Sequence, residues 1–68
     1  MAMAELLAAE RLLAELRARP GTRAQLAKRT GINPGYAGEV LLGLQAAGRA
    51  RRWKRPGTRG YLWEAASG

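Results

Sequence analysis

A run of helix start and stop signals between residues 20 and 34 constrains the fold of this chain more than any other feature. Thr22-Arg23-Ala24-Gln25 has the form of a capping box, in which the Thr hydroxyl accepts a hydrogen bond from the third helical amide and the Gln side chain accepts one from the cap. Gly31 suits the left-handed residue that follows a helix. Asn33-Pro34 then supplies a cap and a favoured first residue for another helix. The sequence therefore predicts two helices joined by a tight turn.

A longer helix is expected before the capping box, over residues 4–19, with Pro20-Gly21 ending it. Its apolar residues recur at helical spacing, and Leu7 falls on the far side from them. The stripe expected in the core consists of Leu6, Ala9, Leu13 and Leu16, with Leu12 on its flank.

The helix that begins at Pro34 is expected to run to about residue 47 and to end at Gly48. Its predicted buried face carries Ala37, Val40, Leu41 and Leu44. Its outward face has one polar side chain, that of Glu39, and carries Gly35, Gly38, Glu39, Leu42 and Ala46. Gly38 and Gly43 each lower helix stability by roughly 1 kcal/mol relative to Ala. Close approach of a binding partner is one reason to keep them, and glycine from a GC-rich genome is the other.

After Gly48 the pattern changes from helix to strand. Residues 49–54 and 61–64 are expected to pair as antiparallel strands around a loop at 55–60. Pro56-Gly57 predicts a type II turn, because Gly can adopt the positive φ that the turn requires. A symmetric loop sets three facing pairs: Lys54 with Tyr61, Arg52 with Trp63, and Arg51 with Glu64.

Composition narrows the function. The 68 residues suffice for one small domain with an ordered core of about residues 4–64, and the net charge is +7. The chain has no Cys, His or Asp, which removes disulfides, most metal ligands and the usual general base, so we expect no cofactor, no metal and no enzyme activity. No apolar run is long enough for a membrane span, and the N-terminus does not resemble a signal peptide. A small basic binding protein of the cytoplasm is expected.

The helical segments resemble a known family. Leu26-Ala27, Thr30-Gly31-Ile32-Asn33-Pro34, Leu41, Leu44, Gly48 and Ala50 resemble the helix-turn-helix and the following strand of bacterial winged-helix regulators, similar to the MarR and ArsR groups without their dimerisation helices. The resemblance implies an α+β winged helix-turn-helix, with three helices followed by a two-stranded basic β-hairpin wing. It also implies a small bacterial or phage regulator or architectural factor that binds double-stranded DNA and is associated with the nucleoid.

The resemblance assigns site residues by position. Its base-reading surface corresponds to Asn33, Gly35, Tyr36, Gly38, Glu39, Leu42 and Gly43. Its backbone-contacting set corresponds to Thr22, Arg23, Lys28 or Arg29, and the wing. The third helix departs from the family because it has no Arg or Lys, so it cannot make the bidentate Arg–guanine contact. Tyr36 is expected to pack its ring on the second helix and to place its hydroxyl near a phosphate.

The wing is the strongest nucleic-acid signal in the sequence. Residues 49–59 contain six basic side chains and no acid. Alternation along a strand allows only two or three of them to reach phosphates. The candidates are Arg51, Arg52, Lys54, Arg55 and Arg59. Tyr61 and Trp63 are expected to cover the open side of the core, where Arg52 can stack on an aromatic ring.

An alternative function uses the same fold without DNA. The face around Leu42 is smooth and apolar enough to bind a protein partner, and fold alone does not separate the two functions. RNA binding carries less weight than either. The expected oligomeric state is a monomer, or a weak homodimer through the first helix.

Overall fold

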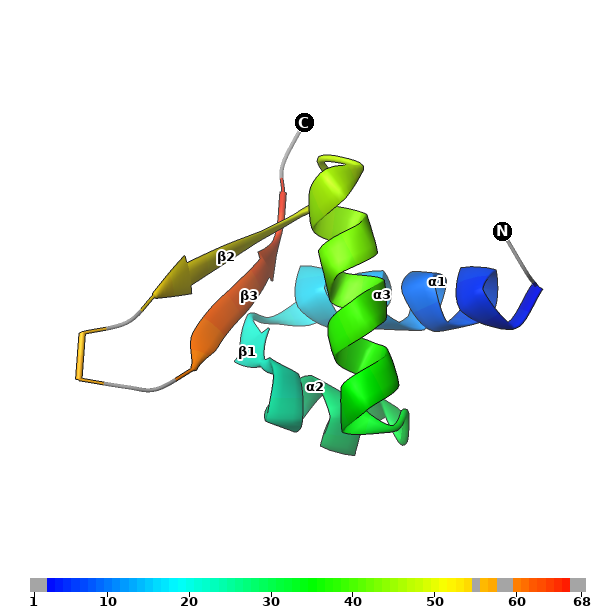
Figure 1. Ribbon diagram of the computed structural model, residues 1–68, viewed down its shortest axis with the longest axis horizontal. Coiled ribbons are helices and arrows are strands. Elements are labelled where there is room, and N and C mark those ends of the chain that lie inside the picture. Colours follow the sequence, from blue (N-terminus) through cyan, green and yellow to red (C-terminus); the bar gives the residue numbers. More distant parts are fainter. Residues whose placement is uncertain (1–2, 55, 58–59, 67–68) are drawn as a thin grey trace.

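The computed structural model describes residues 3–54, 56–57 and 60–66, which form three helices and a three-stranded sheet. In Figure 1 the helices pack together and the hairpin of the last two strands extends to one side. The elements are α1 (Met3–Ala18), β1 (Gly21–Thr22), α2 (Arg23–Thr30), α3 (Pro34–Ala46), β2 (Ala50–Lys54) and β3 (Tyr61–Ala65). This is the α+β winged-helix fold that the sequence predicts.

The signals between residues 20 and 34 act as expected. The hydroxyl oxygen of Thr22 accepts a hydrogen bond from the Gln25 amide at 3.2 Å, and the Gln25 side chain accepts one from the Thr22 amide at 2.9 Å. Gly31 ends α2 with a φ of 76°, and the Asn33 side chain caps α3. Because each signal acts within a few residues, the boundaries follow directly from the sequence.

The strands pair in the order β1-β3-β2, and all three predicted pairs of the hairpin are confirmed. Gly57 has the positive φ, 77°, that the predicted turn requires. The sequence did not predict β1, since two residues show no periodicity. Gly21 pairs with Trp63 and Thr22 with Leu62, which ties the start of α2 to the hairpin.

The core lies where the three helices meet the sheet. Leu12, Leu26 and Leu41, one from each helix, are completely buried. Ala37 and Leu44 of α3 are buried as predicted, and Val40 packs against the cluster while partly exposed. Trp63 of β3 closes the core and is 4% exposed, which confirms its predicted structural role.

The prediction for α1 is wrong in one respect. Leu6 was assigned to the buried stripe, but its side chain is 44% exposed, and Leu12 from the expected flank is at the centre of the core. Leu6 lies on an open groove between α1 and α3 that Val40 and Leu44 also line, so its side chain is only partly covered. The N-terminal turns of α1 extend past α3 (Figure 1). Leu7 is exposed as predicted. Within the described residues, no helix combines the length and apolarity needed to cross a membrane.

Candidate nucleic-acid interface

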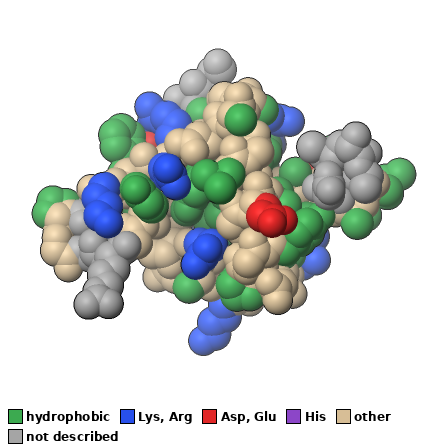
Figure 2. All heavy atoms as spheres, viewed as in Figure 1, with side chains coloured by type: hydrophobic (Ala, Val, Ile, Leu, Met, Phe, Trp, Pro, Cys, Tyr) green, Lys and Arg blue, Asp and Glu red, His purple; other side chains and the backbone are tan. Residues whose placement is uncertain are grey.

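A concave surface of about 660 Å³ lies between α3, the start of α2 and the hairpin. β1 creates it, because its pairing with β3 fixes the first turn of α2 beside the hairpin. We call it the basic groove, since Arg23 and Arg52 both line it. Figure 2 shows Lys and Arg side chains beside hydrophobic side chains on this face of the molecule. Its lining residues are Thr22, Arg23, Ala24, Gly35, Gly38, Glu39, Leu42, Arg52, Gly60, Tyr61 and Trp63.

α3 contributes one face to the basic groove. Gly35, Gly38, Glu39 and Leu42 stand three, one and three residues apart, which places them on the same side of a helix. Leu42 is 48% exposed, and Glu39 is also exposed. The structure therefore brings these four residues together, as the resemblance implied. Gly43 lies elsewhere and lines a second groove described below.

The outward position expected for Gly38 is wrong. Gly38 is buried, because the side chain of Arg23 crosses it from α2. A β-carbon placed on Gly38 would lie 2.9 Å from Cδ and 3.1 Å from Nη1 of Arg23. This contact could not be predicted from the sequence, since the two residues belong to different helices.

The hairpin presents a different set of side chains on each face. Residues directly opposite in an antiparallel pair share a face, so Arg52 and Lys54 lie on the side of Tyr61 and Trp63. The guanidinium of Arg52 lies 4.2 Å from the centre of the Tyr61 ring, and Lys54 Nζ lies 5.3 Å from it. Tyr61 was expected to be structural, but it is 39% exposed and lines the basic groove.

Arg51 belongs to the opposite, outer face of the hairpin. Its guanidinium donates to Glu64 at 2.7 Å and lies 5.2 Å from the ring centre of Trp53. Arg51 does not line the basic groove, so the structure separates it from Arg52. Arg55 and Arg59, the other two basic residues predicted in the wing, lie outside the described residues.

The basic side chains at the two ends of α2 differ in their accessibility to a ligand. Arg23 is exposed and lines the basic groove, while the hydroxyl of Thr22 is engaged in the capping box. Of the pair predicted from the resemblance, Lys28 is exposed. Arg29 is half-buried against Gly21, and its Nη1 is buried with no hydrogen-bond partner in the described part of the chain. Lys28 is therefore the more accessible of the two.

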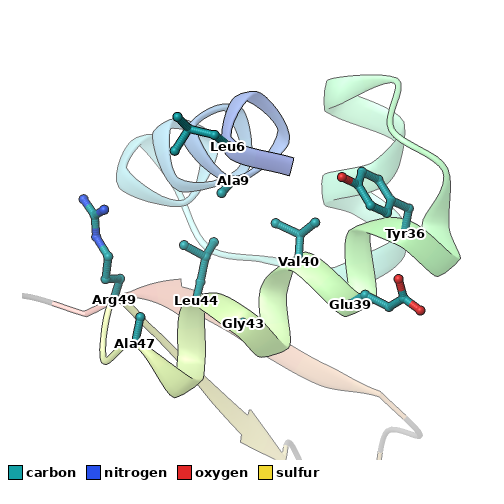
Figure 3. A pocket seen from close by; sticks show the side chains of 9 residues that line it. All are labelled: Leu6, Ala9, Tyr36, Glu39, Val40, Gly43, Leu44, Ala47 and Arg49. Atoms are coloured by element: carbon teal, nitrogen blue, oxygen red, sulfur yellow. The ribbon is translucent and has the colours of Figure 1, made fainter. Parts of the chain in front are cut away.

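Asn33 and Tyr36 do not line the basic groove. The Asn33 side-chain oxygen accepts hydrogen bonds from the amides of Gly35 at 2.9 Å and Tyr36 at 3.3 Å, which commits it to capping α3. Tyr36 is half-buried and lines a second groove of about 390 Å³ between α1 and α3. In Figure 3 the side chains of Val40 and Leu44 point toward α1 across this second groove, which also contains Leu6, Ala9, Glu39, Gly43, Ala47 and Arg49.

Comparison with known proteins supports the fold. No protein-family model matches the chain, and no curated protein matches its sequence. A solved structure of a mutant of ZitR from Lactococcus lactis superposes with a TM-score of 0.80 over 87% of this chain, at 23% identity. This chain spans about two-fifths of the ZitR chain, because the match covers 41% of it. The fold defines the chain as a winged-helix protein.

Proposed function

We propose that the chain is a small winged-helix protein that binds double-stranded DNA, as a bacterial or phage transcription regulator of the MarR or ArsR kind or as an architectural factor. The basic groove carries this proposal. α3 enters the major groove, which at about 12 Å is wide enough for one helix, and the hairpin contacts flanking phosphates. The protein acts at the nucleoid without a cofactor or a catalytic step, as a monomer or a weak homodimer.

Charge around α3 fits a phosphate-lined partner. Arg23 and Arg52 both line the concave surface beside one face of α3, where their guanidinium groups can contact the phosphates that flank the helix. Lys54 lies on the same hairpin face as Arg52, and Lys28 is exposed on α2. Arg55 and Arg59 are added to these proposed phosphate contacts because of their position in the sequence of the wing. The net charge of +7 strengthens the attraction to any phosphate backbone.

α3 itself offers two contacts to base edges. The exposed carboxylate of Glu39 can accept a hydrogen bond from the amino group of cytosine. Leu42 can make an apolar contact with the methyl group of thymine. Gly35 leaves the backbone of α3 accessible to the DNA at its N-terminal end.

A second candidate function is protein binding through the same face of α3. The observation that favours it is the exposure of Leu42. Its neighbours on α3 are a glycine and an acidic residue rather than a cluster of Lys and Arg side chains. In that function the basic groove would receive a side chain or helix of the partner and not a nucleic acid.

Fluorescence titration of a mixed-sequence duplex at several salt concentrations separates the two functions. For DNA binding, log K falls with log salt by about 0.9 for each neutralised phosphate. Arg52→Ala should flatten this slope by about one unit. Arg51→Ala is the matched control, since it removes the same charge from the outer face and should change the slope less.

Melting curves of both variants show whether the hairpin still folds. A folded Arg52→Ala protein with the slope of the parent would mean that the hairpin does not contact phosphates. A parent protein with no affinity for the duplex would contradict the DNA proposal and leave protein binding.

A further inference from the structure

The third helix lacks any basic residue, yet an arginine lies on its surface. Arg23 comes from the first turn of α2, and its side chain crosses α3 at Gly38. Both its Cδ and its Nη1 approach the position where a β-carbon of residue 38 would stand, at 2.9 and 3.1 Å. The stem and one end of the guanidinium therefore rest directly on the backbone of α3, inside the basic groove.

The guanidinium of Arg23 is available to a ligand. Within residues 3–54, 56–57 and 60–66, no hydrogen bond or ion pair engages it. Three other arginines have partners: Arg11 donates to the carbonyl of Thr30, Arg51 pairs with Glu64, and Arg52 lies over Tyr61. Arg23 thus lines the groove with its donors unused.

Gly38 makes this position possible. Its φ is not positive, so its backbone conformation does not require glycine. Glycine in a helix interior is unfavourable, and the expected compensation is close approach of another group. Gly43 shows the contrast, because a β-carbon there would have no atom within 4 Å. Of the two glycines beyond the first turn of α3, Gly38 and Gly43, only Gly38 makes room for a side chain.

We propose that Arg23 is a specificity-determining residue that reads a guanine, supplying to the α3 surface the arginine that α3 does not carry. This inference rests on the proposed DNA binding. A guanidinium lying on the helix that enters the major groove faces base edges, where N7 and O6 of guanine accept a bidentate pair of hydrogen bonds. A purely phosphate-binding arginine would instead extend from the flank of the protein toward the DNA backbone.

The first experiment identifies the base preference of the parent protein. A pool of duplexes with a randomised central segment is selected on the parent chain, and the enriched duplex is resynthesised with 7-deazaguanine in place of each guanine in turn. This analogue lacks the N7 acceptor. One position should weaken binding of the parent about tenfold to hundredfold, and the same replacement should leave Arg23→Ala unaffected.

Three variants then test how Arg23 is held. Arg23→Lys keeps the charge but cannot form the bidentate pair, so it should lose the guanine preference while retaining the salt slope. Gly38→Ala should displace Arg23 and lose the same preference, with no loss of thermal stability because the displaced atoms belong to a flexible side chain. Gly43→Ala, the matched control, should keep the preference.

The outcomes are distinguishable. A parent protein that enriches no duplex overturns the proposed function and this inference with it. A parent that enriches a duplex, with the same base preference in Arg23→Ala and Arg23→Lys, overturns the inference alone and makes Arg23 a phosphate contact or a bystander. Enrichment of a duplex insensitive to 7-deazaguanine also overturns it. If Gly38→Ala does not fold, the two Arg23 variants still decide the question.

Discussion

The two faces of the hairpin carry the same kinds of side chain in different surroundings. The groove face has Arg52, Lys54, Tyr61 and Trp63, and the outer face has Arg51, Trp53, Leu62 and Glu64. Each face therefore combines basic and aromatic residues, and a basic side chain stacks on a ring on both.

The surroundings decide what each face does. Trp63 is 4% exposed because it meets the helices, whereas Trp53 is 49% exposed on the outer face. Arg51 is paired with an acid, while Arg52 lines a concave surface beside α3. The number of basic and aromatic side chains in the wing therefore does not locate a binding surface, because alternation along the strands distributes them between the two faces of the hairpin.

The largest expected difference between the faces is in stability. Trp63→Ala removes a buried ring from the core and should lower the free energy of unfolding by about 3–5 kcal/mol, much of what a domain of this size has. Trp53→Ala removes a half-exposed ring and should lower it by less than about 1 kcal/mol. Urea denaturation followed by far-ultraviolet circular dichroism measures both. Similar losses for the two variants would mean that the faces are assigned wrongly.

A smaller effect is expected from the ring that supports Arg52. Tyr61→Ala removes the aromatic surface beneath the guanidinium, so Arg52 loses a contact worth about 0.5–1 kcal/mol and becomes less ordered. Duplex affinity should fall by about twofold to fivefold. Trp53→Ala removes the equivalent ring from the outer face and should leave the affinity unchanged. Fluorescence titrations of the two variants at one salt concentration test the comparison; equal losses of affinity would contradict it.

The smallest effect is expected at the ion pair of the outer face. Glu64→Gln removes the acceptor of Arg51, whose side chain is 56% exposed, so stability should change by no more than about 1 kcal/mol. Because salt screens exposed charges, the difference in melting temperature should shrink as salt is raised. Duplex affinity should stay the same or increase slightly as one negative charge is lost. A large loss of affinity would place the outer face in the binding surface.

Local signals explain what the sequence predicted about the fold. The capping box at Thr22, the left-handed Gly31, the Asn33 cap and the hairpin register each depend on residues close together in the chain. Such features form through short hydrogen bonds and backbone preferences, which a sequence displays directly. The core face of α3 was also predictable, because a helix with a long apolar stripe has one way to bury it.

The candidate site was only partly predictable, because it also depends on contacts between residues far apart in the chain. The resemblance named the residues of α3 that line the basic groove, but it placed Arg51 with Arg52 and left Tyr61 out. It also left Arg23 at the DNA backbone, with no indication that this side chain lies over α3. Which strand face meets the groove and which side chain crosses between helices depend on contacts between elements, which residue type does not encode.

The sequence by itself determined where the helices begin and end, how the hairpin pairs and that the chain is basic and contains no Cys, His or Asp. Only the tertiary structure decided the rest. The pairing of β1 with β3 formed the basic groove, the open groove between α1 and α3 left Leu6 partly exposed, and the packing of α2 on α3 laid Arg23 over Gly38. Each of these depends on residues far apart in the chain, whose meeting is set by the packing of whole elements and not by any local preference.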